Sequence, residues 1–245
     1  YLIGCSQQYG SIYIRRSEDN GNTWTHPTGE SNGILARGGF YHDPPNYHCA
    51  PMPVLRAHGR LWRGFEDNTP CSWPEGFRSL VISADEDADL LNAASWRMSN
   101  KLRYDPAWTP REWGKIDKPG WLEGNCVEAP DGSLVNILRF NSPPLADKAA
   151  TVQVLDEGAR LVFDPSTGFI DFPGGNTKFT IRRDAKTGRY LTLSNNNTDP
   201  TTPGQRNVLS LHVSEDLRHW EHRITLMEDD LPIPWEDSVR LTGFQ

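Results

Sequence analysis

The sequence predicts an all-β fold that is built from repeated antiparallel units of four strands. Short runs of residues alternate between apolar and polar, as half-buried strands do, and turns that contain Gly separate them. The order strand, Gly turn, strand, strand, polar turn, strand recurs at intervals of about 60 residues. Helical periodicity is nearly absent. A repeat of this kind is typical of the four-stranded blades of a β-propeller.

The first half of the chain contains the end of one such unit and most of another. The strands expected there lie at residues 1–5, 11–15, 51–57, 60–66 and 77–83. Residues 27–47 form a long connection that is rich in Gly and Pro. An insertion at residues 88–94 can hold one or two helical turns.

The second half contains two further units after an irregular stretch, residues 103–120, that is rich in Pro and Trp. Its expected strands lie at residues 121–129, 133–140, 151–155, 160–163, 178–182, 189–194 and 207–213. Residues 243–245 can begin another blade. Because a closed ring usually takes 4–8 blades, we expect the chain to be part of a larger propeller, with residues 1–245 forming one domain.

The turn at residues 17–24, Ser-Glu-Asp-Asn-Gly-Asn-Thr-Trp, identifies the kind of propeller. Asp19 and Gly21 suit a tight turn, because Gly adopts positive φ and Asp bonds to the backbone two residues on. We expect Thr23 and Trp24 to start the next strand, with the indole folded back over the turn. The stretch resembles the Asp box of sialidase-type β-propellers, and degenerate copies occur at residues 83–96 and 214–220. This resemblance implies six blades in a complete ring.

The composition limits the partners of the protein. The chain has 36% hydrophobic residues and nine Trp, which is enough to bury a core. A net charge of -7 without a basic run argues against a nucleic-acid partner. No apolar run approaches the roughly 20 residues that cross a membrane. The sequon Asn196-Asn197-Thr198 agrees with a secreted or periplasmic location, although the chain carries no secretory signal that would assign one.

The cysteines do not suggest a metal site or a cofactor. They show neither a Cys-x-x-Cys motif nor the spacing of a zinc site, and they are Cys5, Cys49, Cys71 and Cys126. We interpret them as buried thiols, with a Cys49–Cys71 disulfide as the alternative.

Residues 121–139 carry the clearest chemical signal. They resemble the sialidase segment Glu-Pro-x-x-x-Glu-Leu-Pro-Asp-Gly-x-Leu-x-x-x-x-Arg, in which the first Glu tunes the nucleophile and the Arg helps to clamp a carboxylate. These roles fall on Glu123 and Arg139, although Gly124 replaces the Pro. An Arg beside a Glu lowers the pKa of the carboxyl group. The structural alternative is an ordinary cross-strand ion pair. Trp121 and Asn125, on the same strand, are candidate substrate-binding residues.

A second candidate region begins at Tyr47. Residues 47–55 and 59–66 resemble the sialidase opening Arg-Ile-Pro-x-Leu-Val…Gly-x-Leu-x-x-Phe-x-Glu, but Cys49 occupies the place of the Arg. Arg binds a carboxylate bidentately, so this replacement puts sialic acid itself in doubt. His48 stands beside the vacant position and is a candidate acid or base, because His titrates near neutrality. A structural His is the alternative.

Two further groups complete the candidates. Glu66 or Asp67 ends a strand and can act as a general acid paired with Glu123, since most glycosidases use two carboxylates about 5–10 Å apart. Asp171 and Lys178 flank the Pro-Gly-Gly turn at residues 173–175 and can bond to sugar hydroxyls. The structural alternative for Glu66 or Asp67 is a solvated charge in a loop. For the region of Asp171 and Lys178 it is a plain turn.

These observations favour an exo-acting carbohydrate-active enzyme, a glycoside hydrolase that cleaves terminal sugars, with acidic sugars among the candidates. One alternative is a polysaccharide lyase that acts on uronic-acid glycans, with His48 as acid or base and Arg139 or Lys178 neutralising the carboxylate. The other is a non-catalytic propeller that only binds glycans. In each case a glycan is the expected partner. The resemblance implies a nucleophilic Tyr in a late blade, and no residue of this chain matches it.

Overall fold

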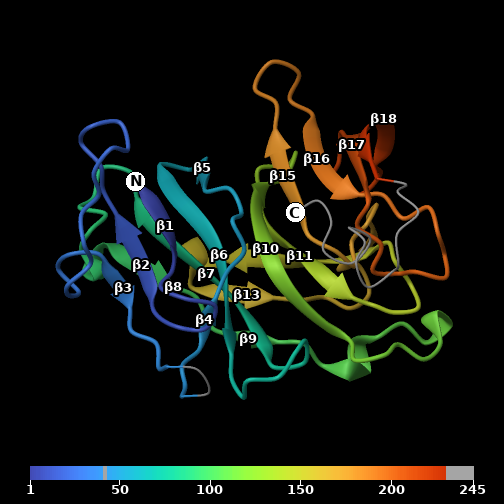
Figure 1. Ribbon diagram of the computed structural model, residues 1–245, viewed down its shortest axis with the longest axis horizontal. Helices are drawn as coiled ribbons and strands as arrows, with labels where there is room; N and C mark the ends of the chain where they lie inside the picture. Colours follow the sequence, from blue (N-terminus) through green and yellow to red (C-terminus); the bar gives the residue numbers. More distant parts are fainter. Residues whose placement is uncertain (41–42, 230–245) are drawn as a thin grey trace.

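The computed structural model describes residues 1–40 and 43–229, and it confirms the all-β fold. The described residues form four antiparallel sheets (Figure 1). The first, which we call the N-terminal sheet, consists of β1 (Leu2–Cys5), β2 (Ile12–Arg15) and β3 (Ile34–Ala36). The other three are four-stranded blades, which we number 1 to 3 in chain order.

Each blade runs up and down in chain order, so that neighbouring strands in the sequence pair in space. In blade 1, β4 (Tyr47–His48) and β5 (Leu55–Ala57) both pair with β6 (Arg60–Asn68). The next strand, β7 (Phe77–Asp85), pairs with both β8 (Trp96–Met98) and β9 (Leu102–Arg103). The first and last strands of this blade are therefore each split into two segments.

Blade 2 consists of β10 (Gly120–Glu128), β11 (Leu134–Asn141), β12 (Lys148–Leu155) and β13 (Arg160–Val162), and β14 (Phe169–Asp171) also pairs with β12. Blade 3 consists of β15 (Phe179–Arg183), β16 (Tyr190–Asn195), β17 (Val208–Ser214) and β18 (Glu221–Glu228). Figure 1 shows blade 2 between the other two blades. The described residues thus form three blades that follow a three-stranded sheet.

Helical structure is confined to single 3-10 turns in the described residues. One of them, η1 (Ala93–Ser95), ends the insertion for which one or two helical turns were expected. The other three are η2 (Pro106–Trp108), η3 (Arg111–Trp113) and η4 (Asp156–Gly158). No helix in the described part of the chain is long and apolar enough to span a membrane.

The turn at residues 17–24 has the expected hydrogen bonds but does not lead into a strand. The Asp19 carboxylate accepts from the Thr23 amide at 2.8 Å and from its hydroxyl at 2.6 Å, and the Trp24 indole donates to the Gly21 carbonyl at 3.0 Å. The expectation that Thr23 and Trp24 begin a strand is wrong, because these bonds hold both residues in the turn. The next strand is β3. The blade start expected at residues 243–245 lies outside the described residues.

Apolar cores lie between the sheets and join them in series. Blades 1 and 2 share one core, to which Trp62 and Val81 contribute from one side and Trp121 and Leu138 from the other. Blades 2 and 3 share a second core, which includes Ile137 from β11. A third core joins the N-terminal sheet to blade 1. Each blade therefore buries both of its faces only when its neighbours are present.

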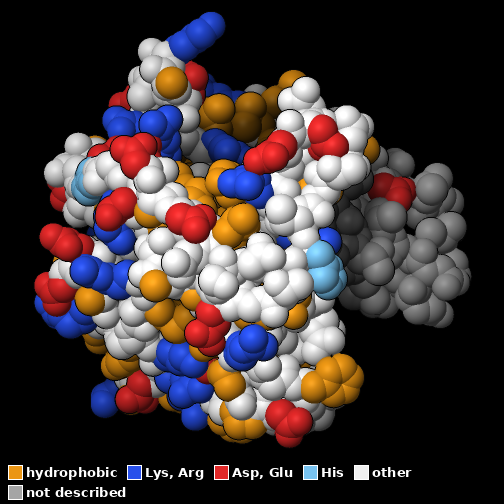
Figure 2. Space-filling model, turned by 90° about the vertical axis from the view of Figure 1, so that its left-hand side faces the viewer, with side chains coloured by type: hydrophobic (Ala, Val, Ile, Leu, Met, Phe, Trp, Pro, Cys, Tyr) orange, Lys and Arg blue, Asp and Glu red, His pale blue; other side chains and the backbone are white. Residues whose placement is uncertain are grey.

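The surface beside the N-terminal sheet carries charges of both signs. Acidic and basic side chains are interspersed there, with no large area of one sign (Figure 2). The charged side chains of the candidate site are instead buried, and they are described below.

Candidate active site

The candidate site is organised around Glu123, which sits in a bulge of β10. The pairing of β10 with β11 shifts between Leu122 and Asn125, so Glu123 and Gly124 are not paired with residues of β11 in the register. The backbone φ of Glu123 is +61°, a conformation that residues with a side chain seldom adopt. Bulges often redirect a side chain next to an active site. Here the bulge holds a carboxylate that is only 6% exposed.

Two cations hold this carboxylate. Arg139, which follows on β11, places Nη1 3.1 Å from Glu123 Oε2 and donates from Nε to the Asn176 carbonyl at 3.0 Å. Lys178 Nζ lies 3.6 Å from Glu123 Oε1. Burial alone would raise the pKa of Glu123, but the charges of Arg139 and Lys178 outweigh it and lower the pKa. Glu123 is therefore ionised at neutral pH.

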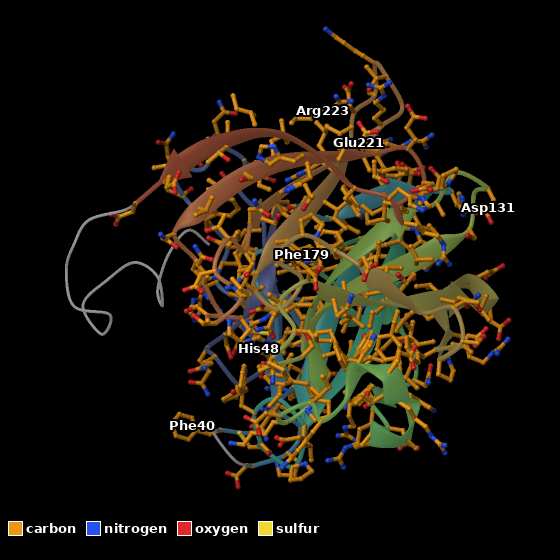
Figure 3. The ribbon with its side chains drawn as sticks, turned by 90° about the vertical axis from the view of Figure 1, so that its right-hand side faces the viewer. Phe40, His48, Asp131, Phe179, Glu221 and Arg223 are labelled. Carbon is orange, nitrogen blue, oxygen red and sulfur yellow. The ribbon has the colours of Figure 1, made fainter. Side chains whose placement is uncertain are left out.

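A His–Glu pair lies beside this cluster, on β4 and β6. Antiparallel pairing sets His48 opposite Glu66, and His48 Nδ1 lies 3.0 Å from Glu66 Oε2. The other oxygen of Glu66 accepts a hydrogen bond from the Gly124 amide at 3.1 Å, which ties the pair to the bulge of β10. Figure 3 shows His48 toward the middle of the molecule with Phe179, whereas Asp131 lies at its edge.

Glu66 and His48 differ in their access to solvent, and the surroundings of His48 determine its charge. The Glu66 side chain is 1% exposed and the His48 side chain 14%. Burial favours neutral imidazole and lowers the pKa of His48, but the hydrogen bond and charge of Glu66, with help from Glu123, raise it above the ordinary value. The influence of Glu123 shows that the His–Glu pair and the cation-bound carboxylate share one electrostatic environment.

Asp67, the other candidate acid, points away from this pair because successive strand residues face opposite sides. Its carboxylate is fully buried and ion-paired with Arg78 at 2.8 Å and Lys101 at 2.6 Å. It also accepts from the Asn46 amide at 3.0 Å and the Thr69 hydroxyl at 2.7 Å. Burial raises the pKa of Asp67, and these partners, with Lys101 foremost, lower it overall.

The other candidates lie apart from the cluster. Trp121 is fully buried in the core between blades 1 and 2, where no ring face is open to a sugar. Asn125 bonds to the backbone of β15, accepting from Ile181 at 3.1 Å and donating to Phe179 at 3.5 Å. Asp171 is exposed and pairs with Lys148. The structure thus brings together five candidates, which are His48, Glu66, Glu123, Arg139 and Lys178.

The solved structures that resemble this chain are enzymes that act on glycosides. A Hadza microbial sialidase matches with a TM-score of 0.55 and 16% identity over 90% of this chain and 37% of its own. An α-L-arabinofuranosidase from Clostridium thermocellum matches with a TM-score of 0.54 and 6% identity over 93% and 66%. A family 117 glycoside hydrolase from Zobellia galactanivorans matches with a TM-score of 0.53 and 13% identity over 91% and 58%.

The chain has the fold of the β-propeller glycoside hydrolases. It spans less than two thirds of the length of each of these three enzymes. No model of a known protein family matches the chain, and no curated protein sequence matches it. At these identities the likeness concerns the fold alone.

Two residues near the five clustered candidates were not among the sequence candidates. Arg206 lies just before β17 and is half-buried. Burial and the charge of Arg139 lower the pKa of Arg206, whereas the charge of Glu123 raises it. Trp73, between β6 and β7, is 48% exposed, and its ring centre lies 5.9 Å from Arg139 Cζ. Both lie in irregular segments. The sequence signal for Arg206 was a cation next to the start of a strand, and the signal for Trp73 was an aromatic residue in a Pro-rich loop.

A cavity adjoins the cluster at Lys178. Its volume is about 540 Å³, and Pro51 and Met52, which follow the His48 segment, line it together with residues of β15, β16 and β17. A larger cleft of about 920 Å³ lies elsewhere, beside Asp171 and Trp220, and none of the five clustered candidates lines it. In the described residues no group of three or more His, Cys, Asp and Glu side chains is arranged to hold a metal.

Proposed function

We propose that this chain belongs to a glycoside hydrolase of sialidase-like type that acts on a terminal, anionic sugar, and that residues 1–245 form part of one propeller domain. The observation that carries the proposal is the buried Glu123, which a strained bulge holds between Arg139 and Lys178 beside the His48–Glu66 pair. The propeller-hydrolase fold of the similar structures supports it. The turn at residues 17–24 is, in this proposal, an Asp box.

The cations supply the recognition of an anion. Arg139 presents a planar guanidinium suited to a carboxylate, and Lys178 and Arg206 add positive charge nearby. Glu123 keeps the cations ordered while the site is empty, and its negative charge can stabilise a positive charge that develops on the sugar ring. The exposed face of Trp73, next to Arg139, is suited to stacking on a sugar.

His48 is the group that we assign to proton transfer. Both oxygens of Glu66 are occupied, one by His48 and the other by the Gly124 amide, and Asp67 is enclosed by four partners. His48 retains partial exposure, and Glu66 fixes its ring and stabilises its protonated form. In this assignment His48 protonates the glycosidic oxygen, and Glu66 orients it.

The same groups also suit a polysaccharide lyase, which is our second candidate. A lyase needs a base that removes the proton α to a uronate carboxylate and cations that neutralise that carboxylate. His48 can serve as the base, and Arg139 and Lys178 as the cations. The observation that favours this candidate is that a His, rather than a free carboxylate, is the partly exposed titratable group of the cluster.

The decisive experiment incubates the protein with sialosides and with uronate polymers. A hydrolase releases a reducing sugar without ultraviolet absorption, whereas a lyase releases an unsaturated, ultraviolet-absorbing product. We expect His48→Gln and Glu123→Gln each to lower turnover at least about 100-fold, as loss of an acid–base group does. Asp171→Asn, at the exposed rim, is the matched control and retains turnover. Glycan binding by the unmutated protein, without turnover of any of these substrates, would instead establish a non-catalytic binding propeller.

A further inference from the structure

Two cysteines from different sheets meet next to the His48 segment. β1 ends at Cys5, and the backbones of Gly10 and Tyr47 form a bridge with hydrogen bonds of 3.0 and 3.1 Å that brings the N-terminal sheet against blade 1. A Cβ placed on Gly4 would lie 3.9 Å from Cys49 Sγ. Cys5 and Cys49 also pack against the same core, so both thiols lie in the contact between these two sheets. A hydrogen bond between the two thiols is the largest influence on the pKa of each.

A buried cation, Arg63, lies near Cys49 and forms no ion pair with an acidic side chain of the described residues. The Arg63 side chain is 1% exposed, and its Nη2 donates to the Ala50 carbonyl at 2.6 Å. Its Nε and Nη1 atoms have no hydrogen-bond partner within the described residues. A buried charge without a partner is costly. A thiolate on Cys49 would supply negative charge at this place.

The surroundings make the two thiols unequal. The hydrogen bond from Cys5 and the charge of Arg63 lower the pKa of Cys49 to about 7, against the opposing effects of burial and of Glu66. The same hydrogen bond, with burial, raises the pKa of Cys5. Cys49 is thus the nucleophile and Cys5 the thiol that retains its proton. Both residues remain partly exposed to solvent.

We propose that Cys5 and Cys49 form a reversible disulfide that fastens the N-terminal sheet to the segment carrying His48. The oxidant is a low-molecular-weight disulfide such as oxidised glutathione. The Cys49 thiolate attacks one of its sulfurs, forms a mixed disulfide and releases one glutathione thiolate, which takes up a proton. Cys5 then loses its proton, attacks the Cys49 sulfur and releases the second glutathione. Two protein thiols are oxidised, and one molecule of oxidised glutathione is reduced to two thiols.

The test equilibrates the protein with mixtures of reduced and oxidised glutathione, blocks free thiols by alkylation and locates cross-linked peptides by mass spectrometry. We expect oxidation to remove two of the four alkylatable thiols and to join the peptides that contain Cys5 and Cys49. Cys71→Ser, the matched control, should form the same cross-link. Cys5→Ser should instead accumulate one glutathionyl group on Cys49, and Cys49→Ser should form neither product.

Two outcomes would overturn the proposal. One is that all four thiols are still alkylated, once the protein is unfolded in denaturant, after equilibration at every glutathione ratio. The other is a cross-link between Cys49 and Cys71 in place of Cys5. Circular dichroism of both Ser variants checks that they are folded, and the glutathionylation of Cys49 in Cys5→Ser gives a positive readout that does not depend on the disulfide. None of these readouts depends on the proposed glycan chemistry.

Discussion

Glu123 combines three properties that an ordinary cross-strand ion pair does not need. It is buried, it has a strained positive φ, and it faces two cations from different segments. Strain of this kind costs about 1–3 kcal/mol and persists where the surroundings impose it, often at functional sites. A surface ion pair could form without any of that cost. The combination favours a functional role over a structural one.

Replacing Glu123 by Gln removes the negative charge but keeps the shape of the side chain. We expect Glu123→Gln to lower the free energy of unfolding by about 3 kcal/mol at pH 7, because Arg139 and Lys178 lose their buried counter-charge. The folded pKa of Glu123 lies below its ordinary 4.5, so this contribution is present above pH 4.5 and disappears as the pH falls through the folded pKa. Urea titrations of both proteins at pH 7 and at lower pH measure it. A stability difference that does not shrink in acid would contradict this account.

The contribution of His48 to stability is expected to depend on pH in the opposite direction. Its folded pKa is raised above 6.5, so its interaction with Glu66 stabilises the protein fully below pH 6.5 and is lost as the pH rises through the folded value. In Glu66→Gln burial should dominate and bring the pKa of His48 below 6.5. NMR titration of the imidazole measures both values. An unchanged pKa would show that Glu66 does not hold the proton on His48.

The sequence could predict the paired residues of the site but not its complete set of charges. The resemblance of residues 121–139 to a sialidase segment selected Glu123 and Arg139. The sequence could not choose between Glu66 and Asp67, because strand alternation places them on opposite faces without saying which face meets His48. Arg206 was missed because its position depends on the path of an irregular loop.

At the scale of elements, the bulge of β10 depends on close backbone contact with β6. A Cβ on Gly64 would lie 2.6 Å from the Gly124 carbonyl oxygen, and one on Gly124 would lie 2.4 Å from the amide group of Asn136. A side chain at Gly64 would separate blades 1 and 2 where Glu66 bonds to the Gly124 amide, and a side chain at Gly124 would displace Asn136 of β11. The two glycines therefore allow the His–Glu pair and the Glu123 cluster to share one site.

Gly64→Ala tests this contact. We expect it to destabilise the protein by about 2 kcal/mol, as overpacking does, and to reduce turnover because β10 must move away from Glu66. Gly29→Ala is the control, because a Cβ there meets nothing within 4 Å. The measurements are thermal unfolding and activity on whichever of the sialosides and uronate polymers the unmutated protein turns over. Equal stability of the two variants would show that the blades adjust without strain.

Most strands were predictable because each combines alternation with a turn signal. The hairpins of β6 with β7 and β10 with β11 lie close to their expected bounds. The short strands β3, β4, β8, β9 and β14 were not predicted, since two or three residues carry no periodicity, and neither was the eight-residue strand β18. The bulge at Glu123 was not predicted either, because it arises from packing between blades and not from local sequence.

At the scale of the whole molecule, the described sheets form a series in which each shares a core with the next. Adjacent residues of β11 show this directly. Ile137 belongs to the core between blades 2 and 3, whereas Leu138 belongs to the core between blades 1 and 2. Both are fully buried. The two faces of one strand thus stabilise different neighbours.

This arrangement predicts that two adjacent substitutions weaken opposite sides of the molecule. Ile137→Ala and Leu138→Ala should each cost about 3 kcal/mol, through lost burial and a cavity. Hydrogen exchange should then rise mainly in β15 and β16 for Ile137→Ala and mainly in β6 and β7 for Leu138→Ala, since local opening follows the weakened core. The candidate site takes residues from blades 1 and 2 and from the start of blade 3, so either variant should also weaken the binding of an anionic sugar that we propose. Equal acceleration of exchange in all blades by both variants would instead show that the sheets unfold as one cooperative unit.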